Sequence, residues 1–209
     1  MVTMAQAPRK ARSNGEASKA KILDAATEIA SERGYDGTSI AQVSKRCGLP
    51  ASSIYWHFAD KDDLIAAVIE RSFGRWLTAW SVPDGGDARQ RVSQMSARVA
   101  EALRESPDFL RLGLMLALER RPVEPRAREM YLKVRAEAHQ AIRDAAIELA
   151  PGLDDRGLDR LATYAMAGAD GLFVAKEIGG DDVDLPVMFG LHASAVMAVA
   201  AELVGGAGE

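Results

Sequence analysis

The sequence predicts an all-α protein in which a short helix-turn-helix segment precedes a larger helical body. Apolar residues recur at spacings of three and four residues along most of the chain, as they do on one face of an α-helix. Glycine- and proline-containing breaks separate these stretches, and we find no alternating β-branched run or hairpin signal that would indicate a sheet. The 209 residues suffice for a module of about fifty residues and one further domain of ordinary size.

The segment 38–61 contains the signals for two short helices joined by a tight turn. Ser39 begins the first helix, and Gln42 follows at the spacing at which each side chain satisfies the other's backbone N–H. Gly48 supplies the positive φ that ends this helix, and Pro50 starts the second helix at a first-turn position. The residues expected to face inward are Ile40, Val43 and Cys47 on the first helix and Ile54 and Phe58 on the second. Two helices arranged in this way form a motif that reads DNA with its second helix.

The charge is divided unevenly along the chain. Residues 1–61 carry nine Lys or Arg and six acidic residues, a net charge of +3. Because the net charge of the whole chain is −4, the remaining residues carry a net charge of −7. A basic segment beside an acidic body suits a protein whose one end meets phosphate. A chance distribution of solvated surface charge is the alternative.

Residues 18–68 resemble the tetracycline-repressor (TetR) family of bacterial transcription regulators. The resemblance implies a three-helix DNA-binding domain followed by a ligand-binding and dimerisation domain of about six helices. It also implies a homodimer that binds a palindromic operator of double-stranded DNA and is released by a small, mostly apolar effector. The matching parts are Ala25-Ala26, Gly34-Tyr35, Thr38-Ser39-Ile40, Cys47-Gly48-Leu49, Ile54-Tyr55-Trp56-His57-Phe58, and Lys61 with Leu64.

Three regions follow from this resemblance and from the helix signals. Residues 1–16 are expected to form a flexible basic arm, residues 17–62 the DNA-binding domain, and residues 63–205 the effector-binding and dimerisation domain. Arg9, Lys10 and Arg12 of the arm would either enter a minor groove or remain a disordered tail. The helices expected besides the two of the motif span about 17–33, 60–79, 88–105, 107–121, 126–149, 158–178 and 185–204.

The resemblance also assigns the DNA contacts. Ser39 matches a phosphate contact at a helix start, and Trp56, His57 and Lys61 match positions that usually contact the DNA backbone. The alternatives are packing for Tyr55, a surface aromatic for Trp56 and a helix cap for His57. The expected DNA contacts are Ser39, Gln42, Ala51, Ser52, Ser53, Tyr55, Trp56, His57 and Lys61.

Two positions depart from the family's pattern. Ala51 stands where relatives often have a basic or long side chain, and it offers at most a contact to a thymine methyl group. Pro50 replaces the usual capping serine or threonine, so the second helix lacks a side-chain cap. Base reading would then rest on Ser52, Ser53, Tyr55 and Gln42, and the operator sequence does not follow from these residues.

The last two helices are rich in small and apolar residues. The stretch 185–201 contains no Asp, Glu, Lys or Arg, but it is short and carries Pro186, Gly190 and His192, so a buried or interface helix is favoured over a membrane span. By resemblance, these helices pair with their copies in a second subunit. Packing within one subunit is the alternative.

A ligand site is expected in the body, where methionines and aromatic residues suit an apolar ligand. Asp170 interrupts a stretch of small apolar residues, so it is expected to anchor a ligand, cap a bond or form a pair across the dimer. The expected ligand contacts are Trp76, Trp80, Met95, Arg98, Phe109, Leu114, Met115, Tyr131, His139, Tyr164, Asp170 and Phe173.

Other classes of protein find little support in the sequence. His57, His139 and His192 lie far apart, and no metalloprotease, paired-cysteine or phosphate-loop motif occurs, so neither catalysis, a metal nor a cofactor is expected. One cysteine allows no disulfide within the chain, and the first residues lack the apolar region of a secretory signal, so a cytoplasmic protein is expected. The rival hypothesis is a helical ligand-binding or scaffold protein that does not bind DNA, and repression and activation both remain open.

Overall fold

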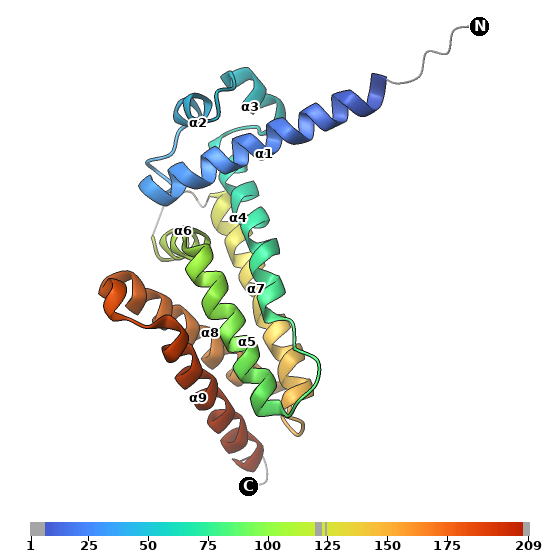
Figure 1. Cartoon of the computed structure of the whole chain (residues 1–209), viewed down its shortest axis with the longest axis vertical. Helices are drawn as coiled ribbons and strands as arrows, with labels where there is room; N and C mark the ends of the chain where they lie inside the picture. Colours follow the sequence, from blue (N-terminus) through green and yellow to red (C-terminus); the bar gives the residue numbers. More distant parts are fainter. Residues whose placement is uncertain (1–6, 120–122, 124, 207–209) are drawn as a thin grey trace, which may run out of the picture. The chain divides into compact units, whose positions relative to one another are not determined.

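The computed structural model describes residues 7–119, 123 and 125–206, and its regular structure within those residues is entirely helical (Figure 1). This confirms the predicted all-α fold class. The helices are α1 (Ala7–Arg33), α2 (Ile40–Cys47), α3 (Ala51–His57), α4 (Lys61–Leu77), α5 (Ala88–Glu105), α6 (Pro107–Leu118), α7 (Arg126–Leu149), α8 (Asp155–Gly179) and α9 (Leu185–Gly206), with short 3-10 turns η1 (Thr78–Trp80) and η2 (Gly180–Asp182).

Contacts divide the chain into two compact units. The first unit comprises the chain up to Ser72 together with Asp108–Leu132, and the second comprises Phe73–Pro107 and the chain from Lys133. The helices α4 and α7 each contribute residues to both units. These units are defined by contacts within the chain, and the expected division after residue 62 remains a prediction.

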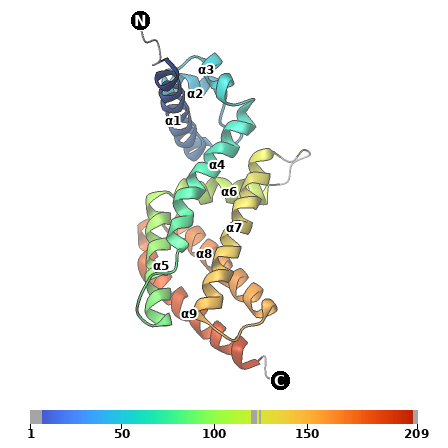
Figure 2. The same ribbon diagram turned by 90° about the vertical axis from the view of Figure 1, so that its right-hand side faces the viewer.

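In the first unit, α1, α2 and α3 enclose a common core, and the three helices lie together in Figures 1 and 2. Ile54 and Phe58 are buried, as predicted, and Val43 of α2 is fully buried beside them. Ile40 and Cys47 are half-buried against the same core. The core cluster consists of Ile22, Leu23, Ala25, Ala26, Ile29, Val43, Ile54, Phe58, Leu64 and Val68.

The two motif helices have the expected ends, with two corrections. Gly48 ends α2 with φ 70°, the left-handed conformation that glycine adopts without strain. Ser39 caps α2 by accepting the N–H of Gln42 at 3.3 Å, but its hydroxyl donates to Gln42 Oε1 at 3.0 Å, so the expected reciprocal capping bond is absent. Pro50 occupies the N-cap of α3 instead of its first turn, and it provides no side-chain cap, as predicted.

Helix α1 begins at Ala7, ten residues before the expected start at Ala17. The sequence accounts for this because Pro8 suits a first helical turn and the following residues are mostly good helix formers. Residues 1–6 of the expected arm and the side chains of Arg9, Lys10 and Arg12 lie outside the described residues.

In the second unit, α9 packs against both α5 and α8, and Figure 2 shows these helices side by side. Asp87 and Gln90 form a reciprocal capping box at the start of α5, with each side chain accepting the other residue's backbone N–H. Asp154 caps α8 by accepting the N–H of Gly157 at 2.7 Å, so α8 begins three residues before its expected start.

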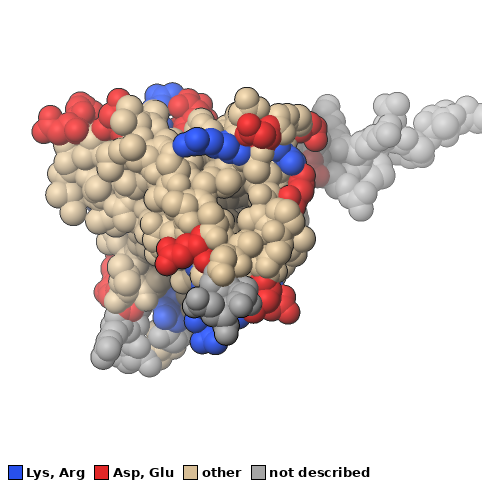
Figure 3. All heavy atoms as spheres, turned by 90° about the horizontal axis from the view of Figure 1, so that it is seen from below, with Lys and Arg blue, Asp and Glu red and all other residues tan. Residues whose placement is uncertain are grey.

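Few residues of helix α9 are fully buried, although the helix is rich in apolar side chains. Its segment 185–205 is long and apolar enough to cross a membrane by length and composition, with a mean hydropathy of 1.8, and only 17% of that stretch is buried. The exposed apolar side chains of α8 and α9 are Tyr164, Val174, Ile178, Val187, Met188, Leu191 and Val204. The face of the molecule drawn in Figure 3 is largely uncharged, with acidic and basic residues scattered over it.

Candidate nucleic-acid interface and ligand cavity

The short helix α3 has a buried face and an exposed aromatic face. Ile54 and Phe58 are buried in the core of the first unit, whereas Tyr55 is 57% and Trp56 75% exposed. Such exposure of two large aromatic side chains is costly unless they meet a partner, and it weakens the alternative that Tyr55 serves packing. Among the other predicted base contacts, Ser52 is exposed, and Gln42, Ala51 and Ser53 are half-buried.

Trp56 leans toward α1 and His57 despite its exposure. Its ring meets His57 edge to face with centroids 4.5 Å apart. A Cβ added to Gly15 of α1 would lie 3.7 Å from the Trp56 ring, so the indole is near α1. The Trp56 ring is therefore largely exposed to solvent, but its contacts with His57 and its position near Gly15 fix its orientation.

His57 carries little positive charge at neutral pH. Burial lowers the pKa of His57 below its usual value of 6.5, and the nearby positive charge of Lys19 lowers it further. The Lys19 ammonium itself lies 5.8 Å from the centroid of the Phe58 ring. The neutral imidazole of His57 is therefore suited to donate one N–H hydrogen bond to a phosphate oxygen.

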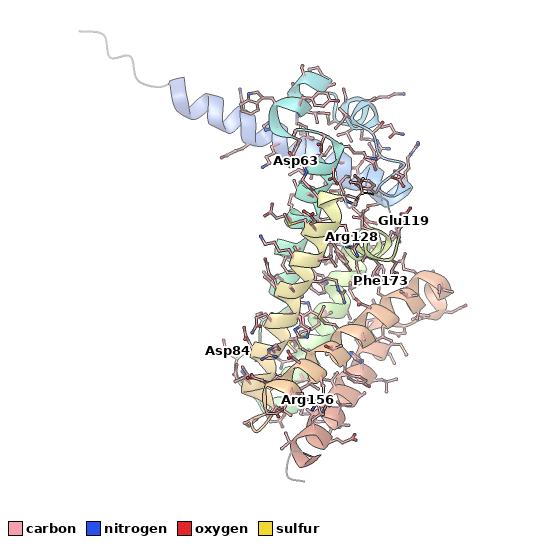
Figure 4. All side chains as sticks on the ribbon, turned by 180° about the vertical axis from the view of Figure 1, so that it is seen from behind. Asp63, Asp84, Glu119, Arg128, Arg156 and Phe173 are labelled. Atoms are coloured by element: carbon pink, nitrogen blue, oxygen red, sulfur yellow. The ribbon has the colours of Figure 1, made fainter. Side chains whose placement is uncertain are left out.

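Lys61 is held by a residue that the sequence analysis did not single out as a site. Its ammonium donates to the backbone carbonyl of Tyr35 at 3.2 Å and lies 4.3 Å from the centroid of the Tyr35 ring. An ammonium has three donors, so this contact leaves others available for phosphate. Figure 4 shows the neighbouring Asp63 at the same end of α4, where the carboxylate of Asp60 caps the helix by accepting the N–H of Asp63 at 2.8 Å.

The second unit contains an apolar cavity of about 70 Å³ that is partly open to solvent. It is lined by α5, α7, α8 and α9 together with Trp80 of η1. Among the described residues that line it, His192 is the only titratable one. The other polar side-chain groups are the hydroxyl of Ser96, which donates to the carbonyl of Phe189 at 2.9 Å, and the indole N–H of Trp80, which is buried without a hydrogen-bond partner. A cavity with this lining fits an uncharged apolar molecule.

The structure brings only two of the predicted ligand contacts, Trp80 and Met95, to the wall of this cavity. Trp76 contacts the Trp80 ring at 5.2 Å between centroids, and Arg98 donates to Ser81 Oγ at 3.4 Å. His139 lies 3.3 Å from the hydroxyl of Thr163, Tyr164 is exposed, and Phe173, labelled in Figure 4, is buried along α8. Phe109, Leu114, Met115 and Tyr131 belong to the first unit.

Asp170 is not a free anchor for a ligand. Its two carboxylate oxygens accept from the guanidinium of Arg135 at 3.0 and 2.7 Å, a two-point ion pair between α8 and α7 of the same chain. The cost that an unpaired charge would carry at this position is thus met within the subunit.

His192 and the small residues around it lie on the cavity wall but were not predicted there. His192 Nε2 lies 3.0 Å from the carbonyl oxygen of Ala165, and a Cβ on Gly168 would come within 2.1 Å of the His192 ring. The sequence signal that could have indicated this wall is the set of alanines in the last two helices, Ala165 and Ala169 on α8 and Ala193 on α9. Small side chains let two helices approach, and where no larger side chain fills the gap they also leave a cavity.

The first of these two regions matches a known family. The family model described as bacterial regulatory proteins, tetR family, matches residues 22–68. An HTH-type transcriptional repressor of Mycobacterium tuberculosis is 28% identical over 109 residues, which cover 52% of this chain and 42% of that protein. The HTH-type transcriptional regulator AcrR of Shigella flexneri is 36% identical over 64 residues, 31% of this chain and 30% of AcrR. The chain thus spans less than half the length of these curated relatives, which are transcriptional regulators by name.

Solved structures agree over most of the chain. A tetR-family regulator from Streptomyces coelicolor superposes with a TM-score of 0.72 at 16% identity, covering 90% of this chain and 83% of that one. FadR of Bacillus subtilis, solved in complex with stearoyl-CoA, gives a TM-score of 0.69 at 16% identity, covering 84% of this chain and 96% of FadR. At these identities the likeness concerns the fold, and it confirms an N-terminal helix-turn-helix domain followed by further helices.

Proposed function

We propose that this chain, whose residues 22–68 belong to the tetR family of bacterial regulatory proteins, is a DNA-binding transcriptional repressor released by a small apolar ligand. The observation that carries the proposal is the exposed aromatic face of α3, set on a buried three-helix core within the matched segment. An exposed surface of this kind at the tip of a helix-turn-helix suits a nucleic acid and has no use inside the unit itself.

In the proposed complex, the start of α3 enters the major groove. Ser52, Ser53 and Tyr55 face base edges with Gln42, and Ala51 offers a thymine methyl contact. Ser39, Trp56, His57 and Lys61 contact the DNA backbone and fix the register, since phosphate contacts position a protein without reading sequence.

The proposed repressor is a homodimer joined through α8 and α9. The exposed apolar side chains of these helices and the largely uncovered stretch 185–205 support this, because such surface is costly in water. Two copies of the chain would place two recognition helices about 34 to 36 Å apart on a near-palindromic operator. Because a second subunit covers α9, we propose a cytoplasmic protein with no membrane contact.

The proposed effector occupies the cavity of the second unit. Trp80, Met95 and His192 line it with small and apolar side chains, which supports a small, uncharged and mostly apolar ligand. Ligand binding would favour a conformation of the dimer with lower affinity for the operator. A ligand shifts that equilibrium only by its differential affinity for the two conformations, typically about 1 to 3 kcal/mol.

The experiment that tests the proposal is selection of bound DNA from a random duplex pool by the purified chain. Enrichment of a near-palindrome, bound with an affinity that falls as salt rises, is the expected result. A pool that returns unenriched would contradict DNA reading and would leave a helical ligand-binding protein in its place. Repression is then checked by a reporter placed downstream of the selected site, where an activator would raise expression.

A further inference from the structure

Tyr35, at the exit of α1, contacts Lys61 in two ways and is itself fixed by Asp62. The Tyr35 hydroxyl donates to Asp62 Oδ1 at 3.0 Å, while the Tyr35 carbonyl and ring hold the Lys61 ammonium. Lys61 and Asp62 are neighbours in the first turn of α4, so Tyr35 contacts the side chains of two consecutive residues.

Asp62 is in turn fixed by the start of α7. Its carboxylate accepts the backbone N–H of Arg126 at 2.6 Å and that of Ala127 at 3.1 Å, in addition to the Tyr35 hydroxyl. These two N–H groups are among those that a helix leaves without partners in its first turn, and a carboxylate is favoured there. The Asp62 side chain is therefore held by three donors from two separate segments of the first unit.

A lysine held in this way differs from a lysine on an open surface. A free lysine side chain loses much rotamer freedom when it binds a phosphate, whereas an ammonium already bonded to a carbonyl and placed over an aromatic ring has lost it beforehand. The ring and the carbonyl leave the other ammonium donors free to turn to solvent.

We propose that Tyr35 and Asp62 are positioning residues for DNA binding: they hold the Lys61 ammonium where it meets a phosphate oxygen. This inference rests on the proposed function, and it adds two residues that do not touch DNA themselves. The competing explanation is that Asp62 merely caps α7 and Tyr35 merely packs, in which case both stabilise the unit without acting through Lys61.

The test is a double-mutant cycle of Tyr35→Phe and Lys61→Met, read as the dissociation constant for a short non-palindromic duplex over a series of salt concentrations. Such a duplex reports the phosphate contacts whether or not an operator is known. Lys61→Met is expected to weaken binding and to reduce the salt slope by about 0.9 for each phosphate that the variant no longer neutralises. Tyr35→Phe is expected to weaken binding about two- to tenfold, the range of one hydrogen bond.

The decisive result is the effect of Tyr35→Phe in the Lys61→Met background. If Tyr35 acts through Lys61, the second substitution changes the dissociation constant no further, because the ammonium that Tyr35 positions is already gone. Asp62→Asn, which keeps the side-chain volume, is expected to behave like Tyr35→Phe. Arg126→Ala is the matched control: it removes the guanidinium that pairs with Asp60 at 2.7 Å and lies 3.8 Å from Asp62 Oδ2, but it leaves both backbone hydrogen bonds to Asp62. It is expected to leave binding within twofold of the parent, because those backbone bonds and the Tyr35 hydroxyl still hold Asp62.

Two results would overturn the inference alone: a Tyr35→Phe effect of equal size in both backgrounds, or a Lys61→Met variant that binds like the parent. Thermal melting followed by circular dichroism accompanies each variant, and the comparison uses those that remain folded. If the parent chain shows no salt-dependent affinity for any duplex, the proposed function itself falls. The two failures are thus separable.

Discussion

At the scale of single residues, the charge on His57 is the property most open to a direct test. Its pKa is lowered first by burial and then by Lys19. Lys19→Met is therefore expected to raise the pKa of His57 toward 6.5, measured by NMR titration of the imidazole Cε1–H signal. Lys21→Met, an exposed lysine two residues along α1 that does not contribute to the shift, is the control.

The same lowered pKa fixes a sign for stability. Between pH 6.5 and the lower folded-state pKa the unfolded chain binds more protons than the folded chain, so the free energy of unfolding falls as the pH is lowered through this window. Well above pH 6.5 His57 is neutral in both states and contributes no pH dependence. Replacing His57 with Gln is expected to remove this part of the acid sensitivity, and urea titrations at several pH values measure it.

Gly113 of α6 is a second residue with a defined physical role. A Cβ at this position would lie 2.0 Å from Cε2 of Tyr131, a ring that is fully buried and has no room to move away. Gly113→Ala is expected to lower the free energy of unfolding by about 1 to 3 kcal/mol through overpacking. Gly74→Ala in α4, where an added Cβ meets nothing within 4 Å, is the control and is expected to be neutral or slightly stabilising.

At the scale of helices, the sequence predicted correctly those helix ends that depend on a single residue at the end itself. Gly48 and Pro50 mark the turn between α2 and α3 because glycine and proline restrict or permit backbone angles by themselves. The early start of α1 was missed because Ser13, Asn14 and Gly15, which have low helix propensity, stand just before the expected start, and the helix continues through them. The capping geometry of Ser39 was missed for a different reason, since the choice of hydroxyl partner depends on the Gln42 rotamer.

The cap of α5 permits a prediction at this scale. Asp87 takes part in both bonds of a reciprocal capping box, so Asp87→Ala is expected to cost about 1 kcal/mol in the free energy of unfolding, read from urea denaturation. Asp84→Ala removes an exposed carboxylate from the same loop, seen in Figure 4, without touching the box. Equal losses in the two variants would show that loop charge, and not capping, stabilises α5.

At the scale of the whole molecule, features formed by contiguous residues could be predicted from the sequence, whereas contacts between residues far apart in the chain could not. The tip of α3 follows from contiguous residues, so Tyr55 and Trp56 were predicted to be surface contacts and are exposed. The hold of Tyr35 on Lys61 joins residues 26 positions apart, and no local pattern announces it. The same holds for the Asp170–Arg135 pair, in which the charge was noticed and its partner was not.

The exposed apolar side chains of α8 and α9 bear on the proposed assembly of the whole molecule into a dimer. Leu191 on α9 is 62% exposed, and an apolar side chain at the centre of a two-fold interface meets its own copy or a near neighbour. Leu191→Asp would bury two carboxylates against apolar surface, so we expect the proposed dimer to weaken by about 2 kcal/mol or more per substituted interface. Sedimentation velocity over a range of protein concentrations measures the dimer affinity, and weaker DNA binding should accompany dissociation because two linked DNA-binding domains bind better than one.

Ile147→Asp on α7 changes a side chain of similar exposure, 57%, outside these two helices and is expected to leave the dimer intact. If the Leu191 variant remains dimeric while the Ile147 variant dissociates, the subunits associate through α7 and the assignment to α8 and α9 is wrong.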